Sequence, residues 1–534
     1  MAYYNDLREY IQALENAGKL VRIRRPINKD TELMPLVRWQ FRGMPEEERK
    51  GFLFENVVDS KGKSYSMPVG VSLLGASRDV YALGLKCSQE EIVDRWIRAL
   101  ANPIEPQLVS TGPVRDVIVK GAELQDEGGG LDKIPIAIST PGFDPAPFLS
   151  SAYWVTKDPE TGIRNVGVYR AMVRGRAKLS AMRQPRQHIG IHWFKHKQLG
   201  KPMEAAIVLG ATPVVGMVSV AKIPYGVDEF AVAGGLIGEP LELVKCETVD
   251  LEVPATAEIV LEGIISTDYL EPEAPFGEFT GHMGRRILNP VFEIKCITHR
   301  ANPIYQTFLS QLPPSEASKI RAVSWEAVIY NHLRYELSIP SVIEVALNEN
   351  CEHDYVGIRF NDPTQDDVWK ALEAVADMDP TVAKVVIAVD EDLDPRDSDQ
   401  ITWAMGFRFQ PHRDQRVKMV GQRKESLLDP SLGPPVTTEA VNVEKEKREG
   451  PSALLINATR KWGFPPVSLP AKQFMENARE IWEAEGLGQL RPKWPWYGYI
   501  LGQWEEENEE EAELAVKGDY YETGRKLAER RVDV

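Results

Sequence analysis

AYWVTKD at residues 152–158 and VGVYRAMV at residues 166–173 open a run of short apolar segments that decides the fold. The run continues with EAAIVLGA (204–211), VVGMVSVAKI (214–223), LELVKCETVDLEVP (241–254), EIVLEGII (258–265) and FEIKCITHR (292–300). We interpret these segments as buried strands, interrupted by one helix-like segment at 186–200. Many strands with few helices predict a sheet-built barrel or sandwich that could enclose a ligand.

Mixed helix and strand patterns flank the β-rich region. Residues 4–17 place Leu7, Tyr10, Ile11 and Leu14 on one helical face, and a strand follows Gly18. A glycine- and proline-rich stretch at 121–148 is typical of a linker. Beyond the β-rich region, helical patterns alternate with strand-like segments, which predicts a third, α/β unit. We divide the chain into four units: 1–125, 126–320, 321–480 and 481–534.

The last unit ends in an acidic segment with few large apolar residues, EEENEEEAELAVKGDYYETGRKLAERR (505–531). We expect one mostly polar helix here. A helix of this composition at a terminus often packs on a neighbouring subunit, so the segment favours a homo-oligomer.

The composition of the chain limits its possible binding partners and its cellular compartment. The 534 residues include 63 basic and 79 acidic side chains, for a net charge of -16, which opposes binding to nucleic acid. The longest uncharged run, 205–221, is shorter than the roughly 20 residues that span a bilayer, so we expect no membrane segment. Four scattered cysteines without a CxxC pair predict a reducing, cytoplasmic setting.

Familiar catalytic motifs are missing, which leaves two groups of polar residues to consider. The chain has no phosphate-binding P-loop, no GxGxxG after a strand and no HExxH. His188, His192 and His196 share one helical face, a spacing that can bind a metal but more often reflects packing. NVGVYRAMVRG (165–175) and YLEPEAPFGEFTGHMG (269–284) carry an amide, an arginine and two glutamates within the β-rich unit.

Taken together, these segments resemble the UbiD-type decarboxylases that depend on prenylated FMN. The resemblance extends over most of the chain. Its most specific parts are DPETGIRNVGVYRAMV (158–173) and EAPFGEFTGHMG (273–284), and INATRKWGFPP (456–466) is similar to the branch that acts on aromatic acids. It implies a multidomain α/β fold with a central split β-barrel that binds the flavin and a C-terminal α/β oligomerisation domain with a terminal helix.

The resemblance also implies roles for individual residues. Arg170, Glu273 and Glu278 match the family's catalytic glutamate–arginine–glutamate network, in which Arg170 orients the departing carboxylate, Glu273 holds Arg170 and Glu278 donates the proton. Asn165, His188 and Glu229 match positions that hold a manganese-like ion, Mn²⁺ or Mg²⁺, against the cofactor phosphate. The backbone carbonyls of Val218, Ser219 and Ala221 match those that hold K⁺ together with Glu229. Lys384 matches a lysine that contacts the phosphate.

The reaction implied is the reversible, non-oxidative decarboxylation of an aromatic or heteroaromatic acid, or of its thioester, through a covalent adduct with prenylated FMN. A flavin prenyltransferase would supply the cofactor, and the assembly would be a dimer or a hexamer. Two alternatives stay open: a subunit of a multi-component aromatic carboxylase, and a metal-dependent hydrolase built on the three histidines. STPGFDPAPFLSS (139–151) departs from the family pattern near the site entrance, so the substrate is left unnamed.

Overall fold

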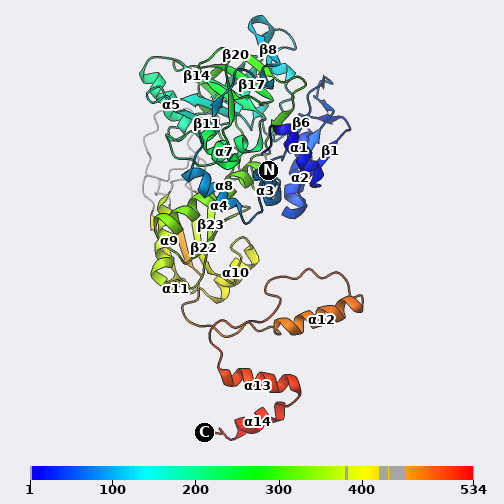
Figure 1. The fold of residues 1–534 in the computed structure, drawn as a ribbon, viewed down its shortest axis with the longest axis vertical. Helices are drawn as coiled ribbons and strands as arrows, with labels where there is room; N and C mark the ends of the chain where they lie inside the picture. Colours follow the sequence, from blue (N-terminus) through cyan, green and yellow to red (C-terminus); the bar gives the residue numbers. More distant parts are fainter. Residues whose placement is uncertain (1–2, 379–382, 420–430, 432–451, 533–534) are drawn as a thin grey trace.

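The computed structural model describes residues 3–378, 383–419, 431 and 452–532. Figure 1 shows an N-terminal α/β unit beside a central β-rich unit, a C-terminal α/β unit below them, and an extended tail. The predicted multidomain α/β architecture is therefore confirmed. In the part of the chain that is described, no helix is long and apolar enough to cross a membrane.

The N-terminal unit is built around a four-stranded sheet. Helix α1 (Leu7–Asn16) begins where the Asp6 carboxylate accepts hydrogen bonds from two backbone N–H groups, and it buries the four predicted side chains. The sheet has the order β1-β3-β6-β21, and β21 comes from far along the chain, so it joins this unit to the central one. The elements are β1 (Leu20–Ile23), β2 (Ile27–Asn28), α2 (Leu33–Gly43), β3 (Gly51–Phe54), β4 (Val57–Val58), β5 (Ser64–Tyr65), β6 (Val69–Val71), α3 (Arg78–Leu85), α4 (Ile92–Ala101) and β21 (Tyr305–Thr307).

The central unit is a large, mainly antiparallel sheet that curls into a half-barrel, as expected for a split barrel. Its strands follow the order β11-β10-β14-β17-β20-β13-β12-β9, and β8 pairs with β20. The strands are β8 (Val117–Lys120), β9 (Phe148–Leu149), β10 (Tyr153–Lys157), β11 (Arg164–Val168), β12 (Ala171–Gly175), β13 (Lys178–Ser180), β14 (Met203–Leu209), β17 (Ile259–Ile265) and β20 (Val291–His299). Smaller sheets join β7 (Gln107–Leu108), β15 (Glu242–Lys245) and β16 (Glu252–Pro254), and pair β18 (Glu271–Glu273) with β19 (Ile287–Asn289).

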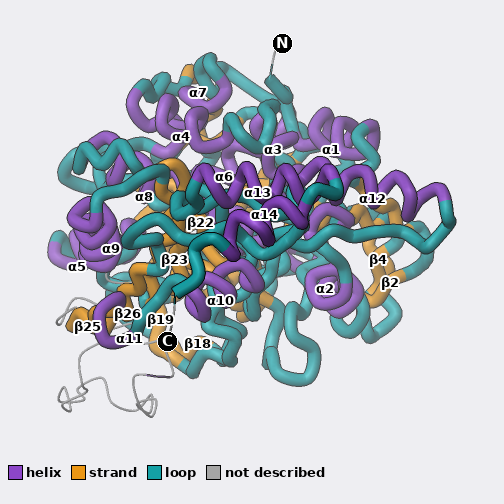
Figure 2. Tube along the Cα trace, turned by 90° about the horizontal axis from the view of Figure 1, so that it is seen from below, coloured by secondary structure: helices purple, strands orange, loops and turns teal. Residues whose placement is uncertain are grey.

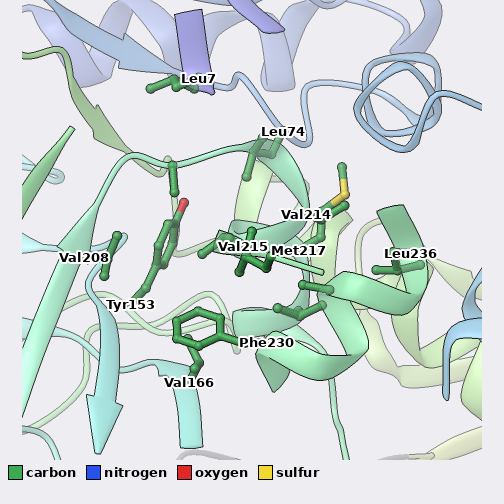
Figure 3. Close-up of a cluster of buried hydrophobic side chains, with 14 of the residues drawn as sticks. Leu7, Leu74, Tyr153, Val166, Val208, Val214, Val215, Met217, Phe230 and Leu236 are labelled. Atoms are coloured by element: carbon green, nitrogen blue, oxygen red, sulfur yellow. The ribbon is translucent and has the colours of Figure 1, made fainter. Parts of the chain in front are cut away.

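Three helices cover this sheet, and one of them corrects a prediction. The predicted helix is α5 (His188–Gln198), but the segment at 214–223, predicted as a strand, forms helix α6 (Pro213–Val220). It packs with α7 (Glu229–Ile237) against the sheet, and Figure 3 shows its side chains among Tyr153, Val166 and Phe230. Because α6 is apolar and buried on nearly all sides, it has no polar face to reveal a helical period. Pro213 fits its first turn.

The C-terminal unit is a five-stranded sheet of order β22-β23-β24-β26-β25 with helices packed on it. The sequence predictions for this unit are confirmed: helices form near 315–333 and 366–378, and strands lie between and after them. The elements are α8 (Glu316–Asn331), β22 (Val342–Asn348), β23 (Glu352–Phe360), α9 (Gln365–Met378), β24 (Val385–Asp390), α10 (Ser398–Phe407), α11 (Pro411–Asp414), β25 (Gln415–Met419) and β26 (Ser452–Asn457).

The tail leaves the C-terminal unit after a short anchored segment. The Tyr499 hydroxyl donates to Oδ2 of Asp392 over 2.7 Å. Beyond this anchor, α13 (Glu506–Lys517) and α14 (Tyr520–Ala528) bury no residue, and neither does α12 (Lys472–Ala484) before it. Figure 1 shows the three helices outside the body, and in Figure 2, seen from below, they lie across it. The single predicted helix at 505–531 is wrong, because Gly518 adopts a left-handed φ of 88° that ends α13.

Candidate active site

Arg170 lies between two glutamates inside the half-barrel. It occupies the short link between β11 and β12, while Glu273 ends β18 and Glu278 lies in the turn that follows. Its Nε donates to Oε1 of Glu273 over 2.7 Å, and its Nη1 donates to Oε1 of Glu278. The guanidinium carbon lies 5.8 Å from the centroid of the Phe276 ring. The structure thus brings together the three residues to which the sequence analysis gave catalytic roles.

Burial and charge act in opposite directions on this triad. Burial by itself lowers the pKa of Arg170, but the carboxylates of Glu278 and Glu273 outweigh it and raise the net pKa. Burial also raises the pKa of Glu278, an effect that Arg170 offsets only in part. Arg170 therefore stays charged, while Glu278 retains a proton more readily than an exposed carboxyl. One cation with one weakly acidic carboxyl is an arrangement suited to proton transfer.

Glu273 is held more rigidly than Glu278. Its second oxygen, Oε2, accepts a hydrogen bond from the Ser180 hydroxyl at the end of β13. The Ser180 oxygen in turn accepts from the backbone N–H of Met172 over 2.8 Å. Both Glu273 oxygens are therefore bonded to neighbours from the sheet, so this residue is placed to fix Arg170.

Asn165, His188 and Glu229 converge from three elements. Asn165 lies on β11, whereas His188 and Glu229 begin α5 and α7. Nδ1 of His188 lies 3.1 Å from Oδ1 of Asn165 and 3.7 Å from Oε1 of Glu229. Burial raises the pKa of Glu229, and His188 lowers it in part. A cavity of about 10 Å³ borders Asn165 and His188, which is room for one water-sized species.

This donor set fits a small divalent cation. It combines a carboxylate oxygen, an amide oxygen and one imidazole nitrogen, which are ligands that Mn²⁺ and Mg²⁺ accept. The amide nitrogen of Asn165, Nδ2, is buried without a partner among the described residues, so a further acceptor could bind there. Such an acceptor is what the oxygens of a flavin phosphate would provide.

The other two histidines of α5 are engaged elsewhere. Nδ1 of His192 lies 2.9 Å from the Thr156 hydroxyl, and burial lowers the pKa of His192 to about 4. Nδ1 of His196 lies 2.9 Å from the backbone oxygen of His192. Across the described ranges, no group of three or more His, Cys, Asp and Glu side chains could hold a metal ion. The three-histidine site of the hydrolase alternative is therefore not formed in them.

The remaining predicted residues lie in two places. Val218 and Ser219 are in the last turn of α6 and Ala221 follows it, so their carbonyls belong to a helix C-terminus, which carries partial negative charge. Lys384 is exposed just before β24, in the C-terminal unit. Its neighbour Ala383 donates to the backbone oxygen of His353 over 2.8 Å, and the His353 ring lies 4.7 Å from that of Phe279. Nζ of Lys384 itself donates to Oγ of Ser431 over 2.5 Å.

Asp144 has no expected role from the sequence, yet it is buried near Arg170. Burial raises the pKa of Asp144 to about 6, and hydrogen bonds from the backbone at Thr140 and Ser139, followed by the charge of Arg170, lower it in part. Its Oδ2 accepts from the backbone N–H of Thr140 over 2.7 Å, while Oδ1 has no partner among the described residues. The proline-rich segment around it is typical of an exposed linker, so the sequence offered no sign of burial.

Comparisons with known proteins find similarity over most of the chain. Three family models match in order: the 3-octaprenyl-4-hydroxybenzoate carboxy-lyase N-terminal domain at residues 11–100, the Rift-related domain at 108–313 and the C-terminal domain at 320–441. An uncharacterised protein of Aquifex aeolicus is 30% identical over 504 residues, which cover 91% of this chain and 99% of that protein.

Two solved structures are similar over most of their length. One is an evolved dimeric form of the UbiD-class enzyme HmfF from Pelotomaculum thermopropionicum in complex with prFMN, with a TM-score of 0.74, 30% identity, and coverage of 88% of this chain and 97% of that one. The other is vanillic acid decarboxylase from Sedimentibacter hydroxybenzoicus in its closed form, with a TM-score of 0.74, 25% identity, and coverage of 90% and 99%.

Proposed function

Because this chain belongs to the UbiD family of carboxy-lyases, we propose that it is a decarboxylase that reversibly releases carbon dioxide from an aromatic or heteroaromatic acid, or from the thioester of one. The observation that carries the proposal is the position of Arg170 between two carboxyls, of which Glu278 has a raised pKa. The proposed cofactor is prenylated FMN with Mn²⁺ or Mg²⁺ and K⁺.

Loss of carbon dioxide leaves an electron pair on an unsaturated carbon, and amino-acid side chains alone do not stabilise it. When bound, prenylated FMN would supply the electron sink that this step requires. The protein's part is to position the acid, keep water away and deliver a proton to the carbon.

Arg170 is suited to orient the substrate carboxylate, because a guanidinium binds a carboxylate through two parallel N–H groups. Glu273 keeps Arg170 in place through their 2.7 Å hydrogen bond. As the carbon–carbon bond breaks, carbon dioxide departs, and the proton on the Glu278 carboxyl transfers to the carbon that has lost it. The raised pKa of Glu278 favours the protonated form that this step consumes.

A second group of residues would hold the cofactor. Asn165, His188 and Glu229 would bind the divalent ion that neutralises the flavin phosphate. The carbonyls of Val218, Ser219 and Ala221 would bind K⁺ with Glu229, and Lys384 would approach the phosphate from the C-terminal unit. The small cavity beside Asn165 and His188 supports the binding of an ion next to these two residues.

The proposal is tested by producing the protein together with a flavin prenyltransferase. The purified enzyme should show the absorption of a modified flavin, contain a divalent metal, and release carbon dioxide from at least one member of a panel of aromatic acids and thioesters. Glu278→Gln should keep the flavin absorption and lose activity by about 10²–10⁴-fold. A protein that binds no flavin, or a Glu278→Gln variant with wild-type turnover, would overturn it.

A further inference from the structure

Gln311 is a buried polar residue next to the candidate proton donor. It lies in the loop between β21 and α8, and only 7% of its surface is exposed. Its backbone has a φ of 69°, a conformation that costs free energy for a residue other than glycine. A Cβ atom built on Gly277 would lie 2.3 Å from Cγ of Gln311. The Gln311 side chain therefore lies directly on Gly277, the residue before Glu278.

Arg38 of α2 holds this loop in place. Its guanidinium donates to the backbone oxygens of Leu312, over 2.7 Å, and of Ser310. It also donates to Oε1 of Gln311 over 3.3 Å. Arg42, one turn further along α2, donates to the backbone oxygen of Pro313 over 2.8 Å. The N-terminal unit thus fixes both the loop and the carboxamide of Gln311.

The contact with Arg38 decides which way the carboxamide faces. A guanidinium has only donors, so it must meet the oxygen of the carboxamide and leave the nitrogen on the other side. That nitrogen, Nε2, is buried without a hydrogen-bond partner among the residues described. A buried donor of this kind costs free energy unless a ligand supplies an acceptor. The neighbourhood of Glu278 is where the proposed substrate would bind.

We propose that Gln311 is a specificity-determining residue, whose carboxamide N–H donates to a neutral oxygen on the ring of the acid, such as a hydroxyl. The inference rests on the proposed function. The carboxylate of the acid is matched by the charge of Arg170, whereas a neutral carboxamide suits an uncharged acceptor. Arg38 acts as a positioning residue. The preferred substrates are therefore oxygen-substituted aromatic acids.

The test compares the three hydroxybenzoic acids with their methyl counterparts, which have a similar shape and no acceptor. Calorimetry on the flavin-loaded enzyme gives the ratio of dissociation constants for each pair, and carbon dioxide release gives the ratio of kcat/KM. For at least one ring position, the wild-type enzyme should favour the hydroxy acid by about tenfold or more. Gln311→Leu should bring that ratio close to one without changing the flavin absorption.

Two further variants separate recognition from general damage. Gln125→Met, at an exposed position, is the matched control for Gln311→Met: the first should keep the wild-type ratio, whereas the second has no N–H to donate and should lose the preference for the hydroxy acid. Arg38→Met should lower the ratio as Gln311→Leu does. The double variant should lower the ratio no further than either single variant. A purely structural role of Arg38 would weaken binding of both acids equally.

The possible failures are distinguishable. If the loaded wild-type enzyme releases no carbon dioxide from any acid, the proposed function fails. If it is active but shows no preference at any ring position, or if Gln311→Leu keeps the wild-type ratios, the role of Gln311 is overturned.

Discussion

Arg170 donates from Nε to Oε1 of Glu273 over 2.7 Å, and the Glu273 side chain is fully shielded from solvent. Glu273→Gln would replace the buried carboxylate that holds Arg170 with a neutral carboxamide. We expect a loss of about 3 kcal/mol in the free energy of unfolding, measured by urea titration of the flavin-free protein.

The control for this prediction is Glu293→Gln, because Glu293 pairs with Lys295 and both side chains are about half exposed. An exposed pair contributes less than about 1 kcal/mol. Equal destabilisation by the two substitutions would contradict a structural role for the contact between Arg170 and Glu273.

His188 and His196 should differ in metal binding, although they share a helix. Nδ1 of His188 faces Asn165 and Glu229, whereas Nδ1 of His196 bonds to a backbone oxygen of its own helix. In protein produced with Mn²⁺, His188→Ala should reduce metal affinity by at least about tenfold and lower the flavin content. His196→Ala should keep both. Mass spectrometry of the bound metal checks this. Equal losses of metal in the two variants would refute the assignment of His188 as a metal ligand.

Asp144 should make stability depend on pH. Burial raises its pKa to about 6, so between about pH 4 and 6 the folded protein binds this proton more tightly than the unfolded chain does. The contribution of Asp144 to stability is therefore fully present below about pH 4 and decreases as the pH rises through 6, by at most about 1.4 kcal/mol per pH unit.

The measurement is urea unfolding of the flavin-free protein at several values between pH 4 and 7. Asp144→Asn should show a smaller decrease over this range than the wild type. Asp126→Asn, at an exposed position, should follow the wild-type curve. Parallel curves for the wild type and Asp144→Asn would mean that the carboxyl ionises freely in the folded state.

The tail should matter for assembly more than for folding. Helices α13 and α14 bury no residue against their own chain, and we propose that they pack on a neighbouring subunit. Removal of residues 505–534 should leave the melting temperature of the body within a few degrees and lower the assembly's mass in light scattering. An unchanged number of subunits would contradict this.

Elements whose apolar pattern is local could be predicted from the sequence. The apolar spacing of Leu7, Tyr10, Ile11 and Leu14 predicted α1 because a surface helix buries one face, and all four are buried. The family resemblance identified Arg170, Glu273 and Glu278, because each of them lies in a short segment whose residues are specific to the family. Helix α6 escaped prediction because an apolar segment buried on all sides has no distinguishing period.

Which polar residues come into contact depends on tertiary packing. All three histidines of α5 have the same helical spacing, yet only His188 lies beside both Asn165 and Glu229, because β11 and α7 approach that end of the helix. Gln311 and Arg38 are 273 residues apart, and nothing local links them. Their contact exists because β21 joins the sheet of the N-terminal unit and brings the loop after it against α2, so the direction of the Gln311 carboxamide depends on packing between distant segments.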